Sequence, residues 1–226
     1  MTTPIGYFEG MYAASPDPWS FETRWYDARK HALTVESLSR RRYRSAFEPG
    51  CSTGMLTARL ARRCDRLLAV DAIPAAVAAA AARVAAFPHV TVETAQMPRD
   101  WPDGPFDLVV LSELGYYFDD ADLTTLLDRA TATLEPGGDL VAVHWRRPVK
   151  EHARPGDDVH ARLAAVPGLA RLARHEEADF LLEVFTRIPP ADRPAGGSRS
   201  ADDSRSVADS RSVAEARSVA EREGLA

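Results

Sequence analysis

The sequence has only two cysteines, Cys51 and Cys64, among its 226 residues, and it has no excess of basic charge. Two thiols are too few for a disulfide framework or a four-cysteine zinc site. The net charge of −5 creates no field that would attract nucleic acid, and no basic stripe carries interleaved aromatic residues. These absences argue against disulfide-rich, zinc-finger and nucleic-acid-binding classes.

Long apolar runs and targeting signals are also missing. The longest apolar stretch, residues 72–86, is mostly alanine and contains Arg83, so it falls short of the roughly 20 apolar residues that span a bilayer. The first residues, MTTP, lack the basic and apolar regions of a signal peptide. We therefore expect a cytoplasmic protein without a membrane partner. The sequence does not indicate an oligomeric state.

The chain divides into three parts by composition. Residues 1–44 form an aromatic-rich cover segment and a helix, and residues 45–188 alternate between strand and helix patterns. Such alternation predicts a doubly wound α/β sheet with helices on both faces. Residues 189–226 contain a repeated Ser-Arg-Ser-Val-Ala-Asp/Glu unit with almost no large apolar side chains. That composition predicts a disordered, repetitive tail.

The expected elements follow from apolar runs and from the prolines and glycines between them. A continuous apolar run at residues 106–112 is typical of a strand buried on both faces. Two late β-type runs predict a closing antiparallel hairpin. The expected strands are 45–48, 66–71, 89–93, 106–112, 139–145, 169–175 and 180–186, and the expected helices are 25–39, 54–63, 74–87 and 123–134.

A glycine-containing turn, EPGCSTG, follows the first expected strand at residues 48–54. Glycines in a strand-to-helix turn let the backbone approach a ligand closely, and the helix N-terminus adds hydrogen-bond donors. Gly50 and Gly54 have the outer spacing of a dinucleotide-binding turn, but Ser52 replaces its middle glycine. The turn alone therefore fits any α/β protein as well as a cofactor site.

Two carboxylates narrow the choice of ligand. Asp71 ends the next expected strand, about 20 residues on, where an acidic residue binds ribose hydroxyls. Glu48 precedes the first glycine by two positions, where it would repel a pyrophosphate but attract an amino group and a sulfonium. Together with the closing hairpin, these residues favour S-adenosylmethionine over NAD.

Several short segments of the chain together carry a resemblance to a known family. They are DPW at 17–19, WYD at 25–27, EPGCSTG at 48–54, VDAIP at 70–74, FDLVVLSE at 106–113 and LGYY at 114–117. Over roughly residues 7–186 the chain resembles the nodulation protein S family of class I S-adenosylmethionine-dependent methyltransferases. The resemblance implies a Rossmann-like seven-stranded sheet with an antiparallel last strand, and methyl transfer to a small molecule. The family's namesake methylates the free amine of a deacetylated chitooligosaccharide.

The resemblance also implies a cofactor site. Glu48 and Gly50 would line the methionine part of the cofactor, Asp71 would bind the ribose, and Ile73 would lie under the adenine. Gln96 stands where class I enzymes commonly have an acidic residue, which is a departure from the pattern. The segment 144–148 does not match the namesake, and this leaves the methyl acceptor undetermined. The other residues expected to contact the cofactor are Cys51, Gly54, Met97 and Ser112.

Methyl transfer from a sulfonium mainly requires alignment of donor and acceptor, and an amine acceptor must also lose a proton. Glu113 follows the fourth expected strand and is the first candidate for a catalytic residue, with a helix-cap or ion-pair role as the alternative. His144, at the end of the fifth strand, is the candidate base unless backbone groups satisfy it. Tyr116 and Tyr117 are candidates for catalysis and substrate binding, or else core aromatics.

The cover segment supplies further candidates. Trp19 and Tyr26 would bury the substrate and exclude water, although plain packing onto the sheet explains them as well. His152 and His160 follow the fifth strand and suggest a lid, with His160 as a substrate contact. No pair of histidines has the close spacing of a zinc site, so we expect no metal.

These observations predict an S-adenosylmethionine-dependent methyltransferase that acts on a small molecule, and the family resemblance implies the amine of a deacetylated amino sugar as the acceptor. O-methylation of a natural-product hydroxyl and a non-catalytic S-adenosylmethionine-binding protein are the alternatives. An NAD-dependent oxidoreductase is disfavoured, since no Tyr-x-x-x-Lys pair follows the fourth strand.

Overall fold

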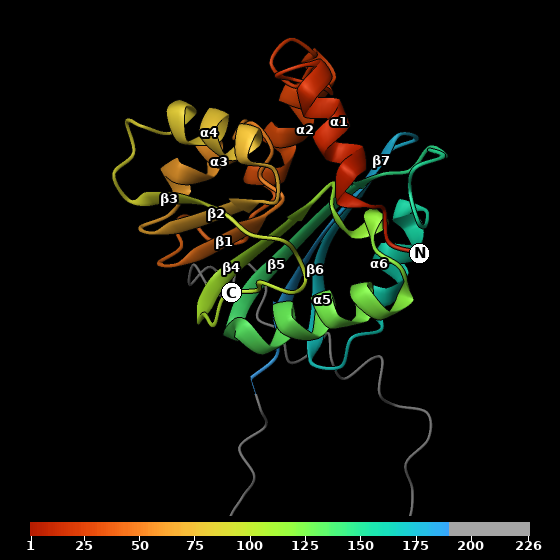
Figure 1. The fold of residues 1–226 in the computed structure, drawn as a ribbon. Coiled ribbons are helices and arrows are strands. Elements are labelled where there is room, and N and C mark those ends of the chain that lie inside the picture. The colour runs from red at the N-terminus through yellow and green to blue at the C-terminus, as the bar shows by residue number, and fades with distance from the viewer. Residues whose placement is uncertain (190–226) are drawn as a thin grey trace, which may run out of the picture.

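The structure, a computed structural model, describes residues 1–189. Within them, seven strands form one mixed sheet in the order β3-β2-β1-β4-β5-β7-β6, in which β7 pairs antiparallel with both β5 and β6 (Figure 1). The predicted disordered tail lies outside the described residues except for Pro189. The strands are β1 (Ala46–Pro49), β2 (Leu67–Asp71), β3 (Val90–Thr94), β4 (Phe106–Ser112), β5 (Leu134–Trp145), β6 (Leu169–Glu176) and β7 (Phe180–Arg187).

Six α-helices and two short 3₁₀ helices accompany the sheet in the described part of the chain. Pro74 begins α4 at a position where a missing N–H costs nothing, and Asp119 caps α5 by accepting from the Asp122 amide. The helices are α1 (Ile5–Ala14), α2 (Trp25–Glu36), α3 (Thr57–Leu60), η1 (Ala61–Arg63), α4 (Pro74–Arg83), η2 (Gly115–Tyr117), α5 (Asp120–Thr133) and α6 (Gly156–Ala164).

The centre of the sheet is buried on both faces, as the apolar run of β4 predicts. Leu108 and Val110 belong to the core under α2 and α3, whereas Val109 and Leu111 belong to the core under α5 and α6. This alternation follows from the two-residue period of a strand. The result is a three-layer α/β/α molecule, and the predicted doubly wound sheet with an antiparallel last strand is confirmed.

The expected helix 54–63 is instead the short α3 followed by η1, and the expected helix 74–87 ends at Arg83. Two further elements differ more from the sequence expectation. Residues 5–14 form α1, which was not expected as a helix, because Gly6 and Gly10 lower its helix propensity. Its buried Tyr12 packs with Ile73 and Ala76, so tertiary contacts stabilise it. Strand β5 begins at Leu134 rather than at residue 139, since the chain continues through a register shift opposite β4.

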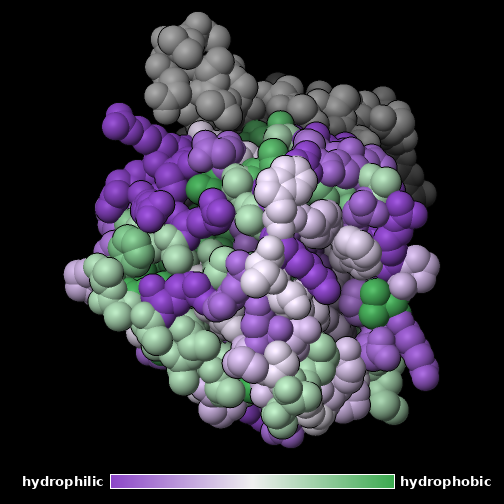
Figure 2. Space-filling model, turned by 90° about the horizontal axis from the view of Figure 1, so that it is seen from above, coloured by the Kyte–Doolittle hydropathy of each residue, from purple (hydrophilic) through white to green (hydrophobic). Residues whose placement is uncertain are grey.

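The parallel strands end on the side of the sheet that α1 covers, where the red helix stands beside the tip of β4 (Figure 1). Figure 2 shows the molecule from above, with a pale green area on the side of α4, whose exposed alanines reach the solvent. None of the helices among residues 1–189 is long and apolar enough to cross a membrane. The fold therefore places a helix-covered region at the carboxyl ends of β1, β2 and β4, the usual ligand position in such sheets.

Candidate functional site

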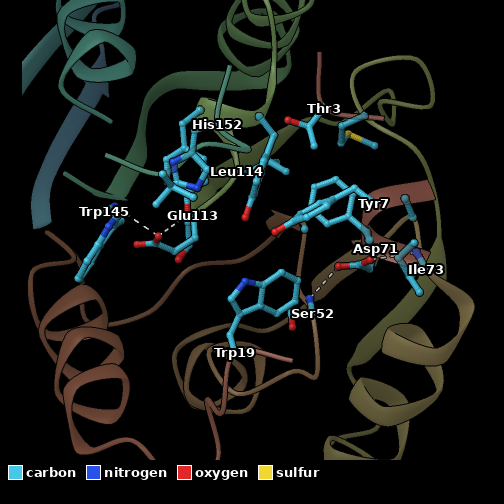
Figure 3. Close-up of a pocket in the computed structure, with 18 of the residues that line it drawn as sticks. Thr3, Tyr7, Trp19, Ser52, Asp71, Ile73, Glu113, Leu114, Trp145 and His152 are labelled. Carbon is cyan, nitrogen blue, oxygen red and sulfur yellow. Dashed lines mark hydrogen bonds between the residues drawn. The ribbon is translucent and has the colours of Figure 1, made fainter. Parts of the chain in front are cut away.

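A cavity of about 610 Å³ lies at these strand ends, between the sheet and α1 and α2. It runs from the glycine turn and Asp71 at one end to Glu113 and Trp145 at the other, and Figure 3 shows Trp19 and Tyr7 between them. Its size is in the range of small-molecule sites. A single cavity thus joins the predicted cofactor end to the region after β4 and β5.

The glycine-turn end is organised around the Asp71 carboxylate. Asp71 Oδ2 accepts the backbone N–H of Ser52 at 2.9 Å, and Oδ1 accepts that of Ile73 at 3.0 Å. Ser52 has a φ of 50°, beside a φ of 73° at Gly50, so the turn is held in a left-handed conformation by this carboxylate. Each Asp71 oxygen keeps further acceptor capacity, which suits a ligand with adjacent hydroxyl groups.

Glu48 lies under the turn rather than in the cavity lining. Its carboxylate is buried, and Oε2 has no hydrogen-bond partner in the described structure. Burial, with a smaller contribution from the negative charge of Asp71, raises the pKa of Glu48 to about 8. A buried carboxylate oxygen without a partner is costly, and a ligand ammonium group would satisfy it. Glu48 therefore fits the amino group of a methionine-type ligand.

The turn packs tightly against α4. A side chain at Gly54, whose φ is 78°, would meet the Ala80 Cα at 2.9 Å. Cys51 is buried with Ala69 and Ala80 in a small apolar cluster. Cys51 and Gly54 thus support the turn from below, and neither lines the cavity.

The N-terminal segment covers the cavity. The Tyr12 hydroxyl and the Ser52 hydroxyl are 2.7 Å apart, which ties α1 to the glycine turn. The Phe8 ring packs edge-on against Tyr117, with centroids 4.8 Å apart, and the Thr3 N–H donates to the Tyr117 carbonyl. Both ends of the cover are therefore fixed on the walls of the site.

Glu113 stands at the other end, and both of its carboxylate oxygens accept hydrogen bonds. Oε1 accepts from Lys30 Nζ at 3.0 Å, and Oε2 accepts from the Tyr116 hydroxyl and, at 3.3 Å, from the Trp145 amide. Glu113 has a φ of 54°, a strained conformation for a non-glycine residue. Glu113 therefore forms an ion pair, which is the alternative role that the sequence analysis gives it. Three donors hold its carboxylate in place.

Lys30 is buried between two carboxylates. Its ammonium lies 3.0 Å from Glu113 and 3.2 Å from Asp27, and 5.1 Å from the centre of the Tyr26 ring. Burial alone lowers the pKa of Lys30, but the two carboxylates outweigh it and the net pKa is raised. Lys30 is therefore a fixed cation. Asp27 and Lys30 were not predicted as site residues, although their spacing of three on a helix places them side by side.

His144 does not line the cavity, and its surroundings favour the alternative of a histidine satisfied by neighbouring groups over that of a base. Its side chain is fully buried; Nε2 accepts the Gly115 amide at 3.1 Å, and Nδ1 lies 3.1 Å from His160 Nε2. His160 Nδ1 in turn lies 2.8 Å from Glu183 Oε2. Each ring nitrogen thus has one partner in a chain that ends on a carboxylate. His160, predicted to contact substrate, is the buried middle member of this chain of hydrogen bonds and does not line the cavity.

The family assignment rests on a match over most of the folded chain. Residues 11–151 match the family model described as nodulation protein S. The chain belongs to the nodulation protein S family. The matched segment includes the cover, the glycine turn, Asp71 and Glu113, and it ends just before His152.

Individual relatives agree with this assignment. A putative methyltransferase from Pseudomonas syringae is 49% identical, with a TM-score of 0.64 over 73% of this chain and 100% of that one. The N-methyltransferase NodS from Bradyrhizobium japonicum WM9, solved in complex with S-adenosyl-L-homocysteine, is 27% identical, with a TM-score of 0.73 over 80% of this chain and 97% of that one.

Nodulation protein S from Sinorhizobium fredii is 31% identical over 130 residues, which are 57% of this chain and 60% of that protein. The match thus spans less than two thirds of the length of this curated relative. The predictions of membership in the nodulation protein S family and of the class I methyltransferase fold are confirmed by these matches and by the sheet order.

Most predicted site residues of this family member do line the cavity. The exceptions are Glu48, Cys51 and Gly54, which lie beneath the turn, and the buried His144 and His160. No group of three or more potential metal ligands occurs in residues 1–189. The predicted residues in the lining are Trp19, Tyr26, Gly50, Asp71, Ile73, Gln96, Met97, Ser112, Glu113, Tyr116 and Tyr117.

Proposed function

We propose that this protein transfers a methyl group from S-adenosylmethionine to the nitrogen of a small amine, such as a deacetylated amino sugar. The observation that carries the proposal is the single cavity that joins Asp71 and the glycine turn to the acidic, aromatic end around Glu113. The relative solved as an N-methyltransferase supports nitrogen as the acceptor atom. Cytoplasmic location stays a prediction.

The glycine-turn end supplies contacts for each part of the donor. Asp71 offers acceptors for ribose hydroxyls, Ile73 offers an apolar surface for the adenine, and the unpaired Glu48 oxygen offers a partner for the amino group. Gln96 and Met97 line the cavity beyond Ile73. When bound, the donor supplies a methyl group already activated by the sulfonium.

The Glu113 end has the character of an amine site. The carboxylates of Asp27, Glu113 and Asp179 line it, together with the rings of Tyr26 and Trp145. Carboxylates stabilise a cationic ligand, and aromatic faces pack against its body. Lys30 and Arg24 line the same cavity, so these three carboxylates exceed the two cations by one charge. This negative charge supports an amine over the hydroxyl of the O-methylation alternative, which would gain less from it.

A binding and product assay tests the proposal. Calorimetric titration with S-adenosylmethionine, S-adenosylhomocysteine and NAD should show binding of the two sulfur compounds and none of NAD. Incubation with S-adenosylmethionine and a chitooligosaccharide deacetylated at one end should give an N-methylated product by mass spectrometry, whereas the fully acetylated oligomer should not react. Binding without methylation of any amine or hydroxyl would favour the non-catalytic alternative.

The Asp71→Asn variant tests the donor end. Asparagine keeps the shape but loses the charge that holds the Ser52 and Ile73 amides and the ribose. Since hydrogen bonds to charged groups contribute about 1.5–3 kcal/mol, we expect S-adenosylhomocysteine to bind roughly 10–100-fold more weakly. Asp103→Asn, at an exposed position outside the cavity, is the matched control. Equal affinities of the two variants would contradict the assignment.

A further inference from the structure

His152 faces the cavity from the loop between β5 and α6. Its ring stacks on Tyr116, with centroids 3.8 Å apart and planes 11° from parallel, and it meets the Tyr117 ring edge-on at 5.0 Å. In Figure 3, His152 lies next to Glu113 and projects into the same space. The aromatic contacts fix the ring plane and leave its nitrogen atoms at the edge.

The other ionisable groups at this end are already engaged. Glu113 accepts three hydrogen bonds, and Asp27 is paired with the buried Lys30. Asp179 accepts from Arg147 at 2.8 Å. Burial raises the pKa of Tyr116 well above its ordinary value. Each of these groups is thus already hydrogen-bonded to or ion-paired with another group of the site.

His152 is different. Neither of its ring nitrogens hydrogen-bonds to another group within residues 1–189, and the side chain is only partly buried, so water can reach it. Burial lowers the pKa of His152, and the carboxylates of Glu113 and Glu151 oppose this only partly. The imidazole is therefore neutral near pH 7, with a basic nitrogen available.

We propose that His152 is the catalytic residue that takes the proton from the acceptor amine, an inference that rests on the proposed N-methylation. The ammonium form of the acceptor gives one proton to His152 and becomes a neutral amine. The nitrogen lone pair then bonds to the methyl carbon as the carbon–sulfur bond breaks, which yields a methylated ammonium and S-adenosylhomocysteine. The imidazolium finally returns its proton to solvent, to which the ring is open.

His152 lies one residue beyond the family match, which covers residues 11–151. His144, the histidine that sequence position favours as a base, is locked in the buried chain with His160. His152 occupies the place on the cavity side of Tyr116 that His144 does not reach.

Two variants separate a proton acceptor from a packing residue. His152→Phe keeps the stack on Tyr116 but removes both nitrogens, and His152→Ala opens a space that added imidazole can fill. The exposed Lys150→Ala on the same loop is the matched control. With the partly deacetylated chitooligosaccharide as acceptor, kcat/KM is measured from pH 5.5 to 9.5, and S-adenosylhomocysteine binding is measured in parallel.

We expect His152→Phe to bind S-adenosylhomocysteine as the wild type does and to lose about 10²-fold or more in kcat/KM at pH 7, the usual contribution of a general base. The deficit should shrink at high pH, where solvent deprotonates the amine. Imidazole should restore His152→Ala but not His152→Phe, and Lys150→Ala should behave as the wild type.

Three results would overturn the inference, and they differ from one another. If the wild type is active and His152→Phe has the same rate and pH profile, the role of His152 is refuted and the proposed function stands. A uniform loss at all pH values without imidazole rescue assigns His152 to packing. A wild type that binds S-adenosylhomocysteine but methylates no amine removes the proposed function, and the inference with it.

Discussion

At the scale of single residues, Glu48 is the buried group whose chemistry depends most on a ligand. Its pKa is raised to about 8, chiefly by burial, and one of its oxygens has no hydrogen-bond partner among residues 1–189. A bound ammonium group would supply the missing partner and favour the ionised carboxylate. Ligand binding and proton release from Glu48 are therefore linked.

This linkage gives a prediction. At pH 7, binding of S-adenosylhomocysteine should release close to one proton, measured by calorimetry in buffers of different ionisation enthalpy. The affinity should rise between pH 6 and 8, by at most roughly tenfold per pH unit. Glu48→Gln should abolish the release, and methylthioadenosine, which lacks the amino group, should release none from the wild type. Proton release from Glu48→Gln equal to that of the wild type would refute the link.

The position of a residue in the sequence predicts only some of the side chains that line the site. The motif positions of Asp71 and Glu113 identify cavity residues, because parallel strands end at one edge of the sheet. His144 also lies at a strand end, yet its side chain points under the α6 layer rather than to the edge. Strand position alone does not give that direction, and neither His152 nor Lys30 belongs to a recognisable motif.

At the scale of elements, the strands could be predicted where a continuous apolar run reports burial on both faces, as in β4. Helix α1 could not, because its two glycines weaken the local signal and its stability comes from contacts with Ile73 and Ala76. The start of β5 was missed because Pro136 and Gly137 are typical of a turn, whereas here the strand passes through them with a register shift.

The packing of α4 on the glycine turn leads to a prediction at this scale. Gly54→Ala forces a side chain into a left-handed position and against the Ala80 backbone at 2.9 Å. We expect a loss of at least about 2 kcal/mol in the free energy of unfolding. Gly10→Ala in α1, where nothing lies within 4 Å, should instead stabilise by about 0.5–1 kcal/mol. Urea denaturation compares them, and equal midpoints would contradict this account.

At the scale of the whole molecule, stability should depend on pH through buried histidines. Burial, aided by the charges of Lys30 and Arg59, lowers the pKa of His31 to about 3, and burial and His160 lower that of His144 well below its usual value. The unfolded chain takes up protons at these sites below about pH 6.5 and the folded protein does not. Stability from both is complete above pH 6.5 and declines as the pH falls.

The contribution of a single buried histidine to the pH dependence of stability can be measured at His31. Its buried Nδ1 has no hydrogen-bond partner in the described part of the chain, so His31→Leu removes a titrating group without breaking a hydrogen bond of that atom. Between pH 6 and 4, urea unfolding of the variant should show a slope of free energy against pH lower by about 1.4 kcal/mol per pH unit, the value for one proton. Near pH 8, where the imidazole is neutral in both states, the titration contributes no difference. A slope equal to that of the wild type would mean that His31 is protonated in the folded protein, and that α2 tolerates a charge beside Lys30.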